Sequence, residues 1–164
     1  MGFGLLTASL TWVISIYPVL RRRRVLAREV TLLRDSEPED GGDALKGMSA
    51  DAAARLLKDL TSQLVSVQGD IVQFPITYYF HNTEERFSLP LALLYLVRLA
   101  EQGNGADHAP QVRRRAAMLG EAVEDFSTTI ASGFLGMPTA PAQEVLHAYA
   151  RDHLHDSPKG KDGG

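Results

Sequence analysis

Imidazole and carboxylate side chains bind divalent metals and move protons, and the chain holds five histidines. His81 precedes Glu84 and Glu85 by three and four residues, a spacing that would bring metal ligands together on one helix face. However, Asn82 and Thr83 between them are typical of a polar loop, and no second histidine lies near in sequence. A solvated turn is therefore favoured over a metal site.

A second group of candidate ligands lies near the C-terminal end. It contains His147, His153 and His155 together with Asp152 and Asp156. Because His153 and His155 are two positions apart, they fall on different faces of a helix. We interpret this group as surface residues, with adventitious metal binding as the alternative.

Other catalytic patterns are missing from the sequence. No serine lies in a nucleophile elbow, no glycine-rich loop could hold a phosphate, and no cysteine is present to supply a thiolate. Successive basic residues occur at Arg113, Arg114 and Arg115, where a solvated helix face is favoured over a site for an acidic partner such as the acidic segment 35–48. The sequence therefore predicts no catalytic residue, no metal site, no cofactor and no enzymatic activity.

The composition describes one ordinary globular domain with an unequal charge distribution. The chain has 164 residues, of which 45% are hydrophobic and 23% are charged, so a largely disordered protein is excluded. Residues 1–34 hold six arginines and one glutamate, whereas the rest of the chain is acidic. Because the basic charge is confined to one short stretch, we do not expect a nucleic-acid partner.

The first twenty residues have the properties of a membrane span. Met1 to Leu20 carry no charged side chain, and twenty helical residues cover about 30 Å, the thickness of the hydrocarbon core of a bilayer. Basic residues follow at once, namely Arg21, Arg22, Arg23, Arg24 and Arg28. A signal peptide would carry its positive charge before the apolar run, and a buried core helix is the remaining alternative. We predict a single-pass protein of the cell inner membrane or plasma membrane with a cytoplasmic C-terminus.

These five arginines have two predicted roles. As a stop-transfer signal they would end the span at Leu20. As a cluster of guanidinium groups they could also bind anionic lipid headgroups. Within the span, Thr7, Thr11 and Ser15 are four residues apart, so they share a face that favours packing against another transmembrane helix.

The remaining residues predict an all-α fold, a small cytosolic helical bundle behind the transmembrane helix. We divide the chain into the membrane helix with its basic exit (1–34), an acidic flexible linker (35–48), the helical domain (49–156) and a disordered tail (157–164). Apolar stripes with steps of three and four residues predict helices over 49–74, 88–102, 110–130 and about 140–155. Ser49 and Ser88 are expected as N-caps, Gly103 as a C-terminal cap, and Gly133 and Gly136 as the end of the third of these helices.

Aromatic residues are concentrated between the first two helices of this domain. The group consists of Phe74, Tyr78, Tyr79, Phe80 and Phe87. We favour a hydrophobic plug that closes one end of the bundle. The alternatives are a ligand pocket and a surface that docks onto the membrane interface.

Two stretches resemble a known family. GFGLLTASLTWVISIYPVLRRRRVLARE (2–29) looks like the pore-lining inner helix of bacterial two-transmembrane potassium-channel-like proteins, and QFPITYYFHNTEERFSLPLALLYLVRLA (73–100) is similar to the cytoplasmic helical segment that follows it. The resemblance implies a subunit of a tetrameric cation channel with a cytosolic regulatory domain. It also implies a gating hinge at a glycine of the inner helix, for which Gly2 and Gly4 are the candidates.

The chain departs from this family in one respect. A potassium-selective filter is built from a TVGYG-like loop, and no such loop occurs in these 164 residues, nor do an outer helix and a pore helix. The first hypothesis is therefore that the chain is a fragment, the C-terminal portion of a potassium channel. The second is a membrane-anchored helical interaction module without transport activity. Both predict membrane lipids as partners and a homo-oligomer, a tetramer in a full channel. No small-molecule ligand is specified by the sequence.

Overall fold

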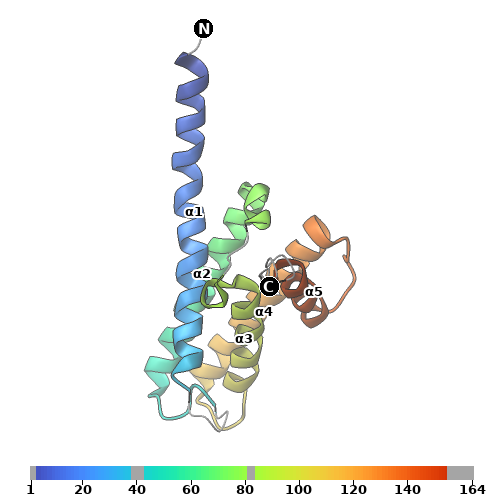
Figure 1. Ribbon diagram of the computed structural model, residues 1–164. Coiled ribbons are helices and arrows are strands. Elements are labelled where there is room, and N and C mark those ends of the chain that lie inside the picture. The colour runs from blue at the N-terminus through green and yellow to red at the C-terminus, as the bar shows by residue number, and fades with distance from the viewer. Residues whose placement is uncertain (1–2, 38–42, 81–83, 155–164) are drawn as a thin grey trace, which may run out of the picture.

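The computed structural model describes residues 3–37, 43–80 and 84–154, and this part of the chain is helical and holds no strand (Figure 1). This confirms the all-α prediction. The helices are α1 (Phe3–Asp35), α2 (Ala50–Gln73), α3 (Leu89–Gly103), α4 (Pro110–Ile130) and α5 (Ala142–Leu154). Shorter turns are η1 (Pro75–Tyr79), η2 (Glu85–Phe87) and the π-helical η3 (Ala131–Leu135).

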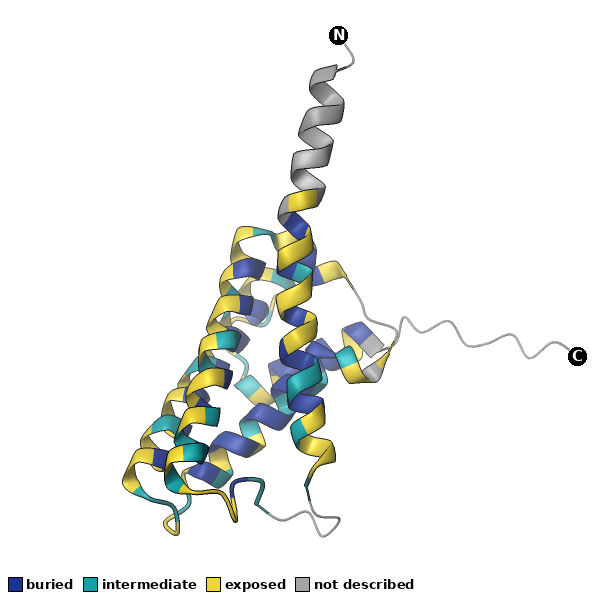
Figure 2. Cartoon of the chain, turned by 90° about the vertical axis from the view of Figure 1, so that its left-hand side faces the viewer, coloured by how far each residue is buried: buried dark blue, intermediate teal, exposed yellow. Residues whose placement is uncertain are grey.

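Helix α1 is one unbroken element of 33 residues that continues through Pro18 and all five arginines. At 1.5 Å per residue it is about 50 Å long. Its N-terminal part projects beyond the bundle (Figure 1), whereas buried residues of its C-terminal part face the bundle (Figure 2). Leu26, Ala27 and Val30 are fully buried in the same core as residues of α2–α5. The core of the bundle therefore includes residues that lie before the predicted start of the domain at 49.

The helical conformation expected for the predicted membrane segment is present, since Phe3 to Leu20 all lie in α1. Across the part of the chain that the structure describes, none of the helices combines the length and the apolar character that a membrane span requires. Membrane crossing by α1 stays a prediction.

Four helices form the bundle and alternate in direction. Side-chain bonds from α2 to α4, Asp51 to Gln111 and Gln68 to Asp125, show that these two helices run the same way. Helices α1 and α3 run in the opposite direction, and each packs against its neighbours, α1 on α2 and α3, and α4 on α2 and α3. Helix α5 packs across α3 and α4. The result is a four-helix bundle in which the parallel pairs α1 and α3, and α2 and α4, lie side by side, and α5 covers α3 and α4.

The predicted apolar stripes of α2 and α4 form much of the core. In α4 the apolar residues at steps of three and four are all buried, namely Val112, Ala116, Leu119, Val123, Phe126 and Ile130. In α2 the stripe is buried at Leu60, Leu64, Val67 and Ile71, and it begins at the buried Leu57 rather than at Leu56, which is half-buried. The Ser49 side chain accepts a hydrogen bond from the amide of Ala52, which confirms the predicted N-cap.

Two predicted helix ends differ from the structure. Ser88 occupies the N-cap position of α3, but its side chain makes no capping bond. Gly103 is the last residue of α3 rather than its cap, and Asn104 follows in a right-handed helical conformation. The reason for a glycine here is helix packing, because a Cβ at 103 would lie 2.7 Å from the Cβ of Ala116 on α4. By contrast Gly136, with φ of 64°, adopts the left-handed conformation that glycine favours and ends η3.

The described ends of the predicted linker 35–48 are held by the bundle. Leu45 lies in the core, and Asp43 accepts a bond of 2.6 Å from His108. Residues 38–42 and the predicted tail 157–164 lie outside the described residues.

Replacing Gly103 by alanine is expected to destabilise the bundle. The added methyl group overlaps with Ala116, so α3 and α4 must separate, at a cost of about 1–3 kcal/mol. Gly69→Ala is the matched control, because no atom lies within 4 Å of its added Cβ, and it should stabilise α2 by roughly 0.5–1 kcal/mol. Urea unfolding of the detergent-solubilised chain, followed by circular dichroism, measures both. Equal effects of the two substitutions would contradict the conclusion that Gly103 is required for the close packing of α3 on α4.

Candidate functional site

The basic exit of α1 lies where the helix enters the bundle, and its five arginines differ in their surroundings. Arg21 and Arg24 are exposed, Arg28 is half-buried, and Arg22 is partly exposed. Arg23 retains only 4% of its accessible surface. Successive residues of a helix point about 100° apart, so one run of identical side chains meets both solvent and core.

Arg22 joins α1 to α2 by a two-point ion pair. Its Nε and Nη2 atoms donate to the two carboxylate oxygens of Asp70, at 2.7 and 2.5 Å. The hydrogen bond with Asp70 raises the pKa of the Arg22 guanidinium, and partial desolvation opposes this rise. The parallel geometry fixes both position and orientation. Asp70 of α2 thereby lies at the same level as Arg22 of α1.

Arg23 is held by neutral oxygens. Its Nη1 donates to the backbone carbonyl of Thr77 at 2.7 Å, and its Nη2 donates to the hydroxyl of Tyr149 at 3.3 Å. Its buried Nε has no hydrogen-bond partner. A buried guanidinium needs well-placed acceptors to offset its loss of hydration. Arg23 therefore connects α1 to η1 and α5 at one point.

Tyr78, next to this arginine contact, is the centre of an aromatic cluster. Its ring is buried and stacks on Phe134 at 4.2 Å between centroids, and Tyr149 and His153 lie at 5.3 and 5.0 Å. The hydroxyl donates to Asp152 at 2.8 Å. Burial, and then this bond to Asp152, raise the pKa of Tyr78 well above its ordinary value. His153 contacts the Tyr78 carbonyl at 2.8 Å, so α5 closes onto η1.

The five aromatic residues singled out in the sequence are separated in the structure. Tyr78 is buried, Phe74 and Phe87 are half-buried, and Tyr79 and Phe80 are exposed. The half-buried Phe134 and the buried Tyr149 and His153 complete the cluster around Tyr78. They lie more than 50 residues further along the chain, and local spacing gives no signal for them.

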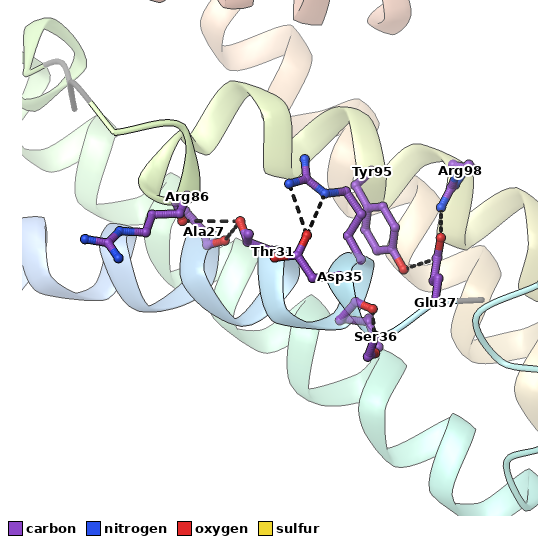
Figure 3. A network of polar contacts seen from close by, with 10 residues as sticks. Ala27, Thr31, Asp35, Ser36, Glu37, Arg86, Tyr95 and Arg98 are labelled. Atoms are coloured by element: carbon purple, nitrogen blue, oxygen red, sulfur yellow. Dashed lines mark hydrogen bonds and ion pairs between the residues drawn. The ribbon is translucent and has the colours of Figure 1, made fainter. Parts of the chain in front are cut away.

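A second polar network holds the C-terminal end of α1 against α3 (Figure 3). The carboxylate of Glu37 accepts hydrogen bonds from the hydroxyl of Tyr95 and the guanidinium of Arg98. Burial, and then the bond to Glu37, raise the pKa of Tyr95. Six residues before Glu37, the Thr31 hydroxyl contacts the carbonyls of Ala27 and Arg86 at 2.8 and 3.2 Å.

Two grooves border the exposed side of the arginine run. One, of about 510 Å³, lies between α1 and α2 and is lined by Tyr17, Pro18, Arg21, Arg22, Val25, Ser62, Gln63 and Ser66. The other, of about 360 Å³, lies along α1 beside Phe87 and includes Arg21, Arg24 and Arg28. The second groove also contains Glu29, whose carboxylate accepts a hydrogen bond from Gln63 at 2.8 Å. The first groove, with apolar walls and guanidinium groups, suits an anionic amphiphile.

The candidate metal ligands are not brought together in the described part of the chain. His81 lies outside it, and the carboxylate of Glu84 pairs with Arg86. His147 is exposed, His153 is buried among the aromatic rings, and His155 and Asp156 lie outside the described residues. Across the described ranges, no three histidine or carboxylate side chains are placed to hold a metal ion.

The remaining predicted residues are the arginines 113–115 and the two hinge glycines. Arg113 and Arg114 are exposed on α4, and Arg115 is half-buried. Of the hinge candidates, Gly2 lies outside the described residues, and Gly4 is in the first turns of α1.

Comparison of the chain with protein-family models, curated proteins and solved structures finds no match. The resemblance of 2–29 and 73–100 to potassium-channel-like proteins therefore stays a prediction.

Replacing Arg23 by methionine is expected to destabilise the fold by about 1–3 kcal/mol, because the Thr77 carbonyl and the Tyr149 hydroxyl lose their buried donor. The neighbouring Arg24→Met removes the same charge from an exposed position and should change stability by at most about 0.5 kcal/mol. Urea unfolding of both variants in detergent provides the comparison. A larger loss for Arg24→Met would contradict the assigned roles.

The buried hydroxyl of Tyr78 predicts a loss of stability at alkaline pH. Its pKa is raised in the folded chain, so its stabilising effect is complete below the ordinary value of 10.0 and is lost as the pH rises above it. The free energy of unfolding should fall there by up to about 1.4 kcal/mol per pH unit for this group. Tyr78→Phe should reduce that slope in unfolding measured between pH 8 and 11. An unchanged slope would show that Tyr78 does not cause it.

Proposed function

We propose that the chain is the membrane helix and cytoplasmic regulatory domain of a potassium-channel-like membrane protein. In this proposal α1 is the pore-lining inner helix, and it carries movement between the bilayer and the bundle. The observation on which the proposal depends is the continuity of α1, which extends without a break from the uncharged segment into the core of the bundle.

The contacts along α1 support this role. Arg22 is paired with Asp70 near the entrance, Leu26 and Val30 are buried in the middle, and Glu37 is bound just beyond the C-terminal end. A helix held at three levels tilts or rotates together with the elements around it. A displacement of the bundle is therefore transmitted to the N-terminal part of α1, where a channel would have its gate.

The sequence of that N-terminal part supports placement in a membrane. It carries no charge from Met1 to Leu20, and Ile14 and Tyr17, on the side of α1 that the bundle does not cover, are exposed. With the arginines on the cytoplasmic side, the bundle would lie in the cytoplasm. Membrane lipids are then direct partners, and a channel would require four copies of the chain.

The absence of a TVGYG-like loop from these 164 residues favours a second candidate function. A membrane-anchored interaction module without transport activity needs only α1 and the bundle. In the first proposal the filter must come from residues outside this sequence.

Membrane anchoring predicts that the full chain stays with the membrane fraction during an alkaline carbonate wash. Leu6→Lys combined with Leu10→Lys should release it, because each lysine at the centre of a span costs about 2.5–3.5 kcal/mol. The matched control is Val65→Lys with Met118→Lys, which adds the same charge at exposed positions of the bundle and should leave the chain bound. Release of the unaltered chain would contradict anchoring.

The intact mass of the protein extracted from its native membranes separates the two candidates. A mass about ten kilodaltons above 17.9 kDa, which is roughly the size of an outer helix with a pore loop, supports the channel. A mass of 17.9 kDa, without potassium-selective current from the reconstituted chain, supports the interaction module.

A further inference from the structure

Four large apolar side chains are exposed at one end of the bundle, around η1. Val72, Ile76, Tyr79 and Phe80 retain 61%, 48%, 63% and 42% of their accessible surface. We call these four residues the η1 tip. Val72, Ile76 and Tyr79 are four and three residues apart, and Phe80 directly follows Tyr79. The residues Thr77 and Tyr78 between them are buried. A group of apolar side chains at one place on a surface indicates an interaction site.

Two contacts fix the η1 tip relative to α1. Asp70 lies at the level of Arg22, and the Thr77 carbonyl is bound by Arg23. From Asp70 the chain continues to the end of α2, about 5 Å further toward the N-terminus of α1. Figure 1 shows η1 at the end of the bundle from which α1 projects. The η1 tip is therefore near the level at which the proposed membrane span ends.

We propose that the η1 tip is a second membrane contact, in which Ile76, Tyr79 and Phe80 enter the headgroup region of an anionic bilayer. This inference rests on the proposed function, because it requires α1 to cross the membrane. Aromatic side chains favour this interfacial region, and apolar residues of peripheral segments lie about 5–10 Å deep in it.

The charges around the tip favour a lipid surface over a second copy of the chain. Arg21 and Arg24 are exposed near the same level of α1. Of the two described carboxylates near the tip, Asp70 is paired with Arg22, whereas Asp152 keeps its negative charge in its hydrogen bond from the neutral Tyr78 hydroxyl. The two exposed arginines outnumber this one carboxylate. Two copies that met through their tips would bring like-charged arginines together, whereas anionic headgroups neutralise them.

The contact has a geometric consequence. A bundle attached only through α1 could turn about the helix axis relative to the membrane plane. With the η1 tip inserted as well, the bundle has two attachments and a fixed orientation.

Fluorescence quenching by brominated lipids tests this inference in the full chain. Trp12 is the single tryptophan of the chain, so Trp12→Phe with Tyr79→Trp places one probe in the tip. In vesicles with a third of anionic lipid, its emission should lose more intensity with lipids brominated near the headgroup than with lipids brominated near the chain end. Met118→Trp in the same background is the control, because this exposed position is on α4, well below the tip, and should not be quenched.

The unaltered Trp12 reports separately on the proposed function. Quenching of Trp12 by deeply placed bromine together with shallow quenching at position 79 supports both the span and the tip contact. Quenching of Trp12 without quenching at 79 overturns the tip contact and leaves the span intact. If neither is quenched, the span fails and the tip inference fails with it.

Two further measurements complete the test. Arg21→Gln with Arg24→Gln should reduce quenching at position 79 toward the value found in vesicles of neutral lipid. A blue-shifted emission at 79 without quenching by any brominated lipid would indicate a contact between protein copies and would overturn the proposal.

Discussion

The burial of Arg23 is the constraint that connects the elements of this fold. A guanidinium group leaves water only where acceptors replace its hydration, and the two acceptors come from η1 and α5. Each of those elements is in turn held by Tyr78, which stacks on Tyr149 and is bonded to Asp152. The position of α1 in the bundle, the closure of α5 and the direction of η1 therefore depend on one another.

The same constraint explains the different roles within the arginine run. Arg23, and Arg22 through Asp70, stabilise the contact between α1 and the bundle, while Arg21, Arg24, the half-buried Arg28 and the exposed part of Arg22 lie at the surface. The stop-transfer and headgroup roles of the five arginines stay predictions. Some arginines of a basic run can thus make contacts in the interior of a protein while others stay exposed on its surface.

The periodic spacing of apolar residues predicted the helices well, because a helix depends on residues that are close in the sequence. The stripe from Val112 to Ile130, the cap at Ser49 and the all-α class all follow from residues a few positions apart. The contacts of the candidate site could not be predicted in this way, because the acceptors of Arg23 lie 54 and 126 residues away in the sequence. Gly103 shows a related limit. A glycine at a helix end is typical of a cap, and only the distance to Ala116 shows that it permits close packing.

The length of α1 that projects beyond the bundle in Figure 1 would give the proposed membrane helix a mechanical property. The described side chains of α1 that pack in the bundle begin near Ile16, so about thirteen residues, or roughly 20 Å, extend beyond the point of support. For a rigid rod of that length, a rotation of about 5° at the bundle displaces the free end by roughly 2 Å. In the proposed channel the helix would act as a lever arm supported near Ile16, so that small rearrangements of side chains in the bundle would displace its far end by roughly 2 Å.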